Sequence, residues 1–376
     1  MIRIIALAVT CLLVTTGSAW AQGASGSVGP FSFTAEALLW WFKGNPTPPS
    51  VTTGTTGALG DPGTKVLIGG DDVDTNPNPG FRLTAGYAFS EQFGLETSVF
   101  YVPTRSTSRE VSSSGQPGSK DLFVPVIDVT LPGEVGENIS AAGFFSGHAR
   151  EKVSNSLLGA DFNGTMRVAA GAGWRLDVLG GFRYMRLRES YTLTTDSPNI
   201  PPFIQDIYST TDQFDATNNF FGGQLGAKFR GDWGNWFANA NVKVGLGAMV
   251  QTVEIAGILR TNDFNNFGAP ISYVGGGYFA TPTNIGQRTR SVFSVIPEAG
   301  LTVGYRINSW LSVVAGYTFL YASDVVRAPG QVVRTVNYSS FNAAPGVPIG
   351  PQEPSFKFKS SDFWAQGINL GVSLRF

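Results

Sequence analysis

Residues 364–376 read Trp-Ala-Gln-Gly-Ile-Asn-Leu-Gly-Val-Ser-Leu-Arg-Phe, and this stretch has the strongest pattern in the chain. Its even-numbered residues are apolar apart from Gln366, whereas its odd-numbered residues are small or polar. Successive side chains of a β-strand point to opposite faces. The stretch therefore predicts a strand with one apolar face and one small or polar face.

The same alternation recurs along the chain in nine further segments. These are residues 34–41, 81–89, 95–102, 158–168, 175–184, 221–229, 237–251, 295–306 and 311–321. Most are close to the 9–11 residues that a tilted transmembrane strand needs. The segments predict an all-β chain with about ten such strands.

The connections between these segments alternate in length. Short links at residues 90–92, 169–173, 231–235 and 307–309 separate long polar stretches at 43–80, 103–156, 192–220, 260–293 and 323–362. Outer-membrane barrels combine short periplasmic turns with longer external loops. The pattern predicts a transmembrane antiparallel up-and-down β-barrel with long extracellular loops and, because the strand count is even, both termini in the periplasm. Residues 123–131 and 271–279 either extend the sheet above the membrane or raise the count to twelve strands.

The composition fits this barrel better than a soluble β-sandwich, which also alternates. The chain has 47 Gly and 28 Phe but only 14% charged residues, and the polar faces of its strands hold Gly, Asn and Ser, as a crowded lumen would. No window offers the roughly 18 consecutive apolar residues of a transmembrane helix. The net charge of −1 does not point to nucleic acid.

The first residues are typical of a secretory signal peptide. Arg3 precedes a short apolar run, and Ala19-Trp20-Ala21 forms a small-x-small cleavage site. We expect residues 1–21 to be a signal peptide for Sec-type export, 22–30 a short periplasmic segment, and 31–376 a single barrel. Cleavage after Ala21 removes Cys11, the only cysteine, so the mature chain would contain no disulfide.

Aromatic residues cluster near both ends of the expected strands, as the interfacial girdles of a membrane barrel do. The girdle candidates are Trp174, Trp233, Trp236 and Trp310 beside the short turns, and Trp41, Tyr101, Tyr321 and Trp364 near the long loops. The terminal Phe376 resembles the C-terminal signal that outer-membrane insertion machinery recognises. Membrane lipid and this machinery are therefore the expected partners.

Every second residue of each predicted strand points inward, and these positions predict the residues that line the lumen. The candidates are Glu36, Arg82, Glu96, Asp161, Arg167, Asp177, Arg183, Lys228, Asn239, Asn241, Lys243, Glu298 and Arg306. Buried charges must be paired or wet, and their near balance indicates a salt-bridged interior. Ten strands give a backbone radius of roughly 10 Å, which predicts a narrow or blocked passage.

Several of these segments resemble the putative β-barrel porin family that is seventh in its naming series and is abundant in planctomycete genomes. The matching stretches are residues 39–43 (LWWFK), 51–54, 59–60, 62–64, 69–70, 80–87, 94–96, 176–184, 221–226 (FGGQLG), 297–301 (PEAGL), 316–321 (GYTFLY), 325–327 and 363–367 (FWAQG). The resemblance covers nearly the whole mature chain, with gaps at 105–155 and 262–289. It implies a barrel in the outer membrane, and it supplies no substrate, reaction or functional residue.

Catalytic chemistry is not expected. The chain has one histidine, His148, which lies in the longest expected loop near Glu151. A lone loop histidine is more often solvated than catalytic, and one histidine without a cysteine cannot form a zinc cluster. The acidic run at residues 70–74 reads as a solvated turn, because the spacing of calcium-binding loops is missing. No cofactor or metal is expected.

Three functions remain open at this point. The first is a structural or surface-display barrel with a narrow or closed lumen, whose loops meet an extracellular ligand or an envelope polymer. The second is a low-conductance porin for ions or small solutes. The third is an outer-membrane hydrolase at the loop rim, which would need His148, an acid and a serine close together. The sequence does not identify a solute or an oligomeric state.

Overall fold

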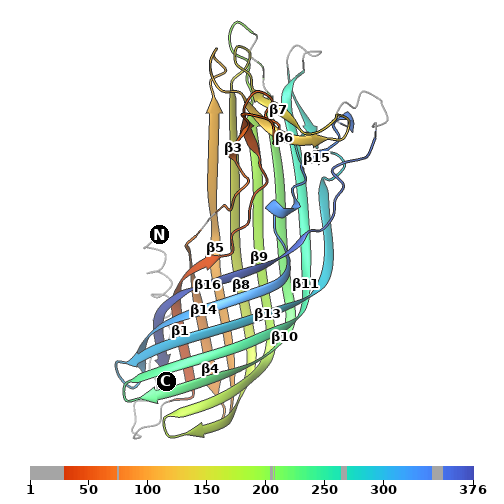
Figure 1. The fold of residues 1–376 in the computed structure, drawn as a ribbon. Helices are drawn as coiled ribbons and strands as arrows, with labels where there is room; N and C mark the ends of the chain where they lie inside the picture. The colour runs from red at the N-terminus through yellow and green to blue at the C-terminus, as the bar shows by residue number, and fades with distance from the viewer. Residues whose placement is uncertain (1–28, 74–75, 204–205, 207, 264–268, 341–349) are drawn as a thin grey trace.

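The computed structural model describes residues 29–376 except 74–75, 204–205, 207, 264–268 and 341–349. Ten antiparallel strands form a closed ring (Figure 1). In ring order they are β10 (Tyr208–Trp233), β9 (Trp174–Asp196), β8 (Gly147–Gly171), β5 (Phe93–Ser113), β4 (Asn78–Ala88), β1 (Phe31–Phe42), β16 (Ser360–Arg375), β14 (Leu311–Val326), β13 (Gly286–Arg306) and β11 (Trp236–Asp263), which pairs with β10. Each of the ten predicted segments overlaps one of these strands, and the predicted count of ten is confirmed.

The alternative count of twelve strands is wrong. β12 (Ala269–Val274) pairs with the end of β11 and lies outside the ring, and β6 (Leu122–Asp128) belongs to a separate small sheet. The ring is complete without either segment, since its first strand, β1, pairs with its last, β16. The remaining predicted possibility, extension of the sheet beyond the ring, describes β12 but not β6, which pairs with β2, β7 and β15 in a sheet of its own.

Both described chain ends lie at the end of the ring that has the short turns. The Phe31 N–H donates to the Phe376 carbonyl, and the Phe376 N–H donates back to the Phe31 carbonyl. We call this side the turn end and the opposite side the loop end. No helix among the described residues is long and apolar enough to cross a membrane.

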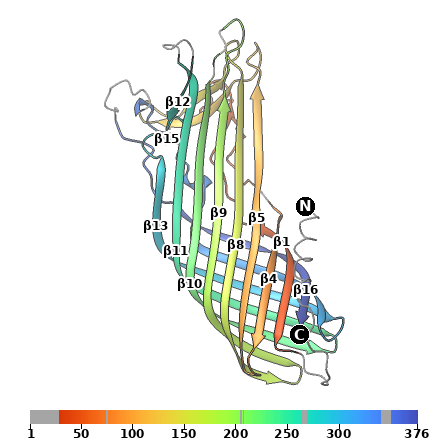
Figure 2. The ribbon, with the colours of Figure 1, turned by 180° about the vertical axis from the view of Figure 1, so that it is seen from behind.

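Six neighbouring strands of the ring are much longer than the other four. β5, β8, β9, β10, β11 and β13 have 21–28 residues, whereas β1, β4, β14 and β16 have 11–16. The excess length forms a tall wall at the loop end, made of residues 105–113, 147–157, 187–196, 208–219, 250–263 and 286–294 (Figure 2). The stretches expected to be loops at 103–156, 192–220 and 260–293 therefore contain much of this wall.

A second, small sheet packs on the inner face of the tall wall. It consists of β15 (Thr335–Val336), β6, β2 (Val51–Thr53) and β3 (Lys65–Ile68), with β7 (Val135–Ser140) paired to β6. Its apolar side chains and those of the wall form one cluster, the outer core. Members of the outer core include Val51, Ile68, Leu122, Val124, Val126, Ile139, Val153, Tyr191, Leu193, Phe214, Val253 and Phe279. The regions predicted as polar loops are thus ordered by a hydrophobic core at the loop end, between the tall wall and the small sheet.

Asp212 fastens the segment 275–285 to the inner face of the wall. The fully buried carboxylate accepts hydrogen bonds from the backbone N–H groups of Tyr278, Phe279 and Ala280 at 2.6–3.0 Å. Burial raises the pKa of this carboxyl to about 6, and the three backbone donors lower it only partly. The anchor lies far along β10 from the apolar ring surface.

The outward face of the ring is a band of exposed apolar side chains. It includes Leu39, Phe81, Phe162, Phe182, Leu225, Val242, Leu246, Leu301, Val313, Ile368 and Leu370. Soluble monomers rarely expose a contiguous apolar patch of more than a few hundred Å². A band around a closed ring is the surface that membrane barrels present to lipid.

Candidate functional site in the barrel lumen

The turn-end half of the lumen is a polar chamber of about 440 Å³. Its wall holds charged side chains from most strands of the ring, and it reaches the turn at Ser90, Glu91 and Gln92. Toward the loop end it stops at a layer of buried charges. The parity of the strands produces this wall, because every second side chain points inward.

Four of the buried charges form an ionic quartet that spans the lumen. Arg183 binds Asp161 through two hydrogen bonds of 2.8 and 2.9 Å and reaches Glu298 at 2.6 Å. The Lys243 Nζ lies 3.0 Å from Asp161 and 3.3 Å from Glu298. All four side chains are at most 8% exposed. Two positive and two negative charges therefore neutralise one another in a layer that is almost closed to solvent.

The quartet joins two cross-strand pairs that are separated by β10. Asp161 lies opposite Arg183 on β8 and β9, and Lys243 lies opposite Glu298 on β11 and β13. Gly245 packs beside the quartet, since a Cβ there would lie 3.3 Å from the Phe220 ring and 3.4 Å from the Arg183 Cδ. A larger residue at this position would compete with the ion pair for space.

A second charged pair sits against the aromatic residues above it. The Arg82 and Glu36 side chains are 3.8 Å apart, and the Arg82 guanidinium lies 5.3 Å from the Trp40 ring and 5.7 Å from the Phe100 ring. The Trp40 Nε1 donates to the Asn369 side-chain oxygen Oδ1 at 2.9 Å. Cation–π contacts of this kind join the charged layer to an apolar layer.

The apolar layer fills the lumen on the loop side of the quartet, and we call it the lumen plug. It consists of Leu38, Trp40, Phe42, Phe100, Val102, Leu157, Met185, Leu187, Phe220, Met249, Ile296, Leu320, Ala322, Val325, Phe363 and Ala365. These residues come from every ring strand except β4, and each is at most 6% exposed. The sequence predicts a salt-bridged interior and a narrow or blocked passage but no apolar layer, so the plug is the main feature that sequence reasoning missed.

Loop residues seal the plug on its far side. Arg327, which follows β14, binds Glu189 of the tall wall at 2.6 Å, and both side chains are at most 4% exposed. The Ala328 N–H also donates to Glu189, at 3.2 Å. The Asn218 side chain pairs with both backbone groups of Val326, at 2.8 Å each. The segment after β14 is thus bound across the top of the plug.

The structure places all the lumen candidates inside the ring. Glu36, Arg82, Glu96, Asp161, Arg167, Asp177, Lys228, Asn239, Asn241, Lys243 and Glu298 line the chamber. Arg183 lies in the quartet, and Arg306 pairs with Asp232 near the turn end. Arg175, Arg230 and Arg375 also face the chamber, although the expected set omitted them. Residues two apart on a strand point to the same face. These arginines are two residues from Asp177, Lys228 and Ser373, which identifies them as inward-facing.

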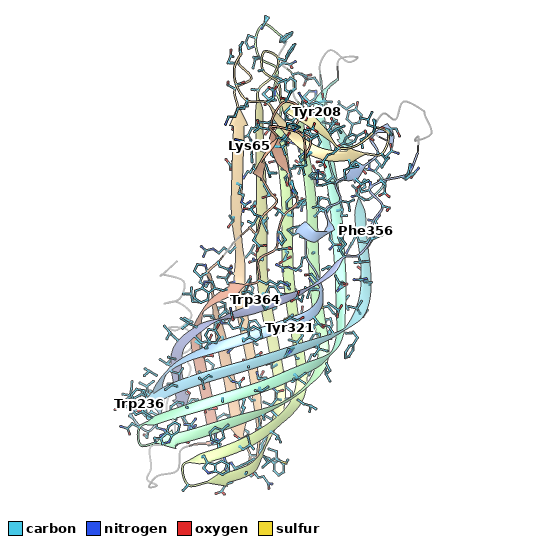
Figure 3. All side chains as sticks on the ribbon, in the orientation of Figure 1. Lys65, Tyr208, Trp236, Tyr321, Phe356 and Trp364 are labelled. Carbon is cyan, nitrogen blue, oxygen red and sulfur yellow. The ribbon has the colours of Figure 1, made fainter. Side chains whose placement is uncertain are left out.

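The girdle candidates lie at two levels of the outer surface. Trp236 lies at the turn end, whereas Tyr321 and Trp364 lie where the short strands meet the loops (Figure 3). Trp174, Trp233, Trp236 and Trp310 are 41–62% exposed. Trp41, Tyr101, Tyr321 and Trp364 are half-buried. Phe376 is 62% exposed and lies beside Phe31.

His148 and Glu151 are not brought together, because they point to opposite faces of β8. Glu151 is buried on the inner face, where it accepts a hydrogen bond from Ser50 at 3.1 Å. His148 is on the outer face, 3.8 Å from carboxylate oxygens of both Glu110 and Asp196. Ser112 lies directly opposite it on β5. This row is partly exposed and none of its members lines either described cavity.

The acidic run at residues 70–74 is held by an arginine. The Asp71 carboxylate pairs with the Arg109 guanidinium, which also donates to the Asp72 carbonyl at 3.0 Å. Asp74 lies outside the described residues. Within the described part of the chain, no cluster of His, Cys, Asp and Glu side chains is arranged to hold a metal ion.

Comparisons with known proteins agree with the barrel geometry. The family model described as "Putative beta barrel porin-7" matches residues 33–376. A search of curated proteins finds no match.

Similar solved structures include the outer membrane protease OmpT from Escherichia coli, at 10% identity, covering 94% of this chain and 99% of that one, with a TM-score of 0.47. A major outer membrane protein from Thermus thermophilus is 13% identical over 92% of this chain and 99% of that one, with a TM-score of 0.23. A Pseudomonas aeruginosa FadL homologue is 9% identical over 92% and 90%, with a TM-score of 0.22. At this level the likeness carries no statement about activity.

Proposed function

Because the chain belongs to the beta barrel porin-7 family, we propose that it is an integral outer-membrane barrel with a closed lumen, acting as a scaffold that displays an ordered outer layer. One observation carries this proposal, namely the lumen plug. Its sixteen side chains fill the cross-section between the ionic quartet and the loop segment held by Arg327.

A closed lumen follows from what an ion would meet on its way through. The chamber admits water as far as the quartet, whose side chains are nearly inaccessible. Beyond the quartet an ion would lose its hydration among aromatic and aliphatic side chains, which is very costly without a partner. Ten strands leave too little radius for a second path past these side chains.

The orientation follows from the usual plan of outer-membrane barrels. Short turns and both termini face the periplasm in this plan, and the long elements face outward. The tall wall, the small sheet and the outer core would then project from the cell surface, with the chamber open to the periplasm. Export through a signal peptide at residues 1–21 and insertion guided by Phe376 belong to the same proposal.

The proposed role requires no enzymatic chemistry. The outer layer offers a polar outward face on the wall, with Ser106, Ser108, Ser154, Ser190, Thr192, Thr194, Thr211 and Thr217 on its surface. Such a face is suited to water, envelope polymers or another protein. Arg186 and Arg188 lie outward where the apolar band gives way to this face.

The first test is single-channel conductance of the refolded chain starting at Gln22, in a planar bilayer. We expect no discrete steps from protein that shows a heat-modifiable gel shift. The shift is the control, because it separates a closed barrel from a chain that failed to fold. Regular steps that shrink when Asn239 or Asn241 is made bulky would contradict the closed lumen and favour the low-conductance porin.

Thiol labelling in cells tests the orientation and the closure together. A chain without Cys11 contains no cysteine, so single cysteines report one position each. A charged, membrane-impermeant thiol reagent should label Ser112→Cys on intact cells, and Asn239→Cys only after the outer membrane is permeabilised. Ala365→Cys, in the plug, should stay unlabelled in both. Labelling of Asn239→Cys on intact cells at the Ser112→Cys rate would argue against the proposal.

A further inference from the structure

Five arginines gather at the turn end of the chamber, and we call them the arginine mouth. They are Arg167, Arg175, Arg230, Arg306 and Arg375. Two carboxylates, Asp177 and Asp232, lie among them, and Glu91 is exposed on the adjoining turn. Nearer the quartet the charges balance instead, since Arg82, Arg183, Lys228 and Lys243 meet Glu36, Glu96, Asp161 and Glu298. The excess of positive charge is therefore confined to the mouth.

The two carboxylates leave many guanidinium donors without an acceptor. Asp177 is shared by Arg167, at 3.7 Å, and Arg175, at 3.2 Å. Both distances are from buried Nε atoms, and at 3.7 Å the Arg167 Nε is beyond hydrogen-bond reach of Asp177 and has no other partner among the described residues. Arg375 has no ion pair with any described residue of the chain. Each guanidinium carries five donors, so the mouth has far more donors than acceptors.

Packing holds two of the arginines in place before any ligand arrives. Arg230 and Arg306 share Asp232, and both stack on the ring of Phe237, at 4.2 and 5.3 Å from its centroid. Stacked, ion-paired guanidinium groups are preorganised, because little rotamer freedom remains to be lost on binding. Arg230 and Arg306 therefore present their remaining donors in fixed positions.

The chamber provides space for a ligand in front of these donors. Its volume of about 440 Å³ lies within the range of small-molecule sites, about 300–1,000 Å³. Neutral polar groups, including Asn239, Asn241 and Thr302, line the space beside the arginines. Access is from the turn end, since the quartet closes the other side.

We propose that the arginine mouth binds a phosphoryl oxyanion that enters the chamber from the turn end. Tetrahedral phosphate offers several acceptor oxygens with charge, and the planar arginine fork matches them in pairs. A bound oxyanion would accept hydrogen bonds from the guanidinium donors that the two carboxylates leave over, and it would neutralise the like charges that the fold holds together. The site is separate from the proposed display role, since it does not depend on whether the lumen conducts. The phosphoryl group could belong to a soluble solute or to a lipid headgroup.

The test is calorimetric titration of the refolded protein in a neutral detergent at low salt, with inorganic pyrophosphate as the probe. We expect binding at one site that weakens when salt is added. Arg175→Gln and Arg375→Gln should each weaken it at least tenfold. Asn239→Trp should weaken it comparably by filling the chamber while every arginine remains. Arg188→Gln, on the outer surface, is the matched control and should leave binding unchanged.

A parallel titration with phosphatidic acid in mixed micelles identifies the source of the group. Binding of pyrophosphate that is lost in the mouth variants supports a soluble ligand. Binding of phosphatidic acid alone, lost in the same variants, supports a lipid headgroup. The proposal is overturned if neither probe binds, or if Arg175→Gln and Arg375→Gln behave like Arg188→Gln. A gel shift in every variant ensures that lost binding does not reflect lost folding.

Discussion

Replacing Arg183 with methionine should lower the free energy of unfolding of the barrel by about 3–5 kcal/mol. The Arg183 guanidinium makes the shortest contacts of the quartet, with hydrogen bonds of 2.6–2.9 Å to both acids, and its side chain is 2% exposed. Its removal leaves two buried carboxylates facing a single Lys243. The measurement is urea-induced unfolding in detergent or lipid, followed by the gel shift.

Two matched variants separate buried charge from simple loss of contacts. Lys228→Met breaks the pair with Glu96 in the wet part of the chamber, where the side chains are 26% and 19% exposed. We expect a loss nearer 1 kcal/mol there, because solvent screens the charge that remains. In Arg183→Met combined with Glu298→Gln, one positive and one negative charge remain. We expect this double variant to unfold at higher urea than Arg183→Met alone.

An equal loss in Arg183→Met and Lys228→Met would contradict the view that the quartet is dry. Failure of the second substitution to recover stability would point instead to lost packing as the cause. Either result would also weaken the case for a sealed lumen, since the quartet forms its lower boundary.

The ring could be predicted from the sequence because lipid and the lumen impose opposite demands on alternate residues. The period of two in residues 364–376 and its recurrence in the other segments fixed the strands. The alternation of short and long connections fixed their antiparallel order. The ring closes where its first strand, β1, pairs with its last, β16, and this pairing is antiparallel because the number of strands is even.

The tall wall could not be predicted in the same way, because its alternation has the reverse sense. In the wall the inner face is apolar, as at Tyr191, Leu193 and Phe214, and the outer face is polar. When apolar residues are expected on the outward face, these strands are predicted as polar loops instead. The cause is that the inner face of the wall meets the small sheet rather than water, and that sheet is assembled from distant segments of the chain.

The sequence contains a signal for the lumen plug, but it is missed when only the outward face of each strand is considered. Aromatic doublets occur at Trp40-Trp41, Phe100-Tyr101, Phe220-Phe221 and Phe363-Trp364. In an alternating strand one ring of each doublet must point outward and the other inward. The structure buries Trp40, Phe100, Phe220 and Phe363 in the plug. Aromatic doublets at the same height on several strands thus predict a plug. The ion pairs of the quartet could not be predicted, because they depend on the register between strands.

Replacing Asp212 with alanine should free the segment 275–285 from the tall wall without unfolding the ring. Three backbone N–H groups would be left buried with no acceptor. At about 1 kcal/mol or more for each, the attachment should weaken by about 3 kcal/mol. Chymotrypsin should then cleave after Tyr278 and Phe279, which are 7% and 0% exposed in the intact protein. The gel shift should not change.

The matched control is Asp215→Ala, three residues further along β10. Its carboxylate faces outward and accepts a hydrogen bond from the Gln213 side-chain amide at 2.6 Å. We expect wild-type resistance to chymotrypsin in this variant. Cleavage in both variants would mean that the wall itself, rather than the anchor, had loosened.

The same anchor should respond to pH, in a direction that its pKa determines. Burial raises the pKa of Asp212 to about 6 in the folded protein, against about 3.9 in an unfolded chain. The Asp212 carboxyl therefore binds its proton more tightly when segment 275–285 is attached than when it is released. The attachment is strongest below about pH 4, and it weakens as the pH rises through 6. Tyr191, Tyr278 and Tyr338 pack in the same core, and burial raises their pKa values, so they stay neutral throughout. The nearby Glu151 carboxyl also has a raised pKa because of burial, so a reference variant is needed.

Asp212→Asn supplies that reference, because its side chain cannot titrate while Glu151 and the protease behave as before. From about pH 5.5 to pH 8, the chymotrypsin cleavage rate of the wild type relative to Asp212→Asn should rise roughly fourfold. A constant ratio would show that the carboxyl is already ionised at the lower pH and that the three N–H donors outweigh its burial. A falling ratio would reverse the sign of the linkage, and the segment would then be held more firmly by the charged carboxylate than by the neutral acid.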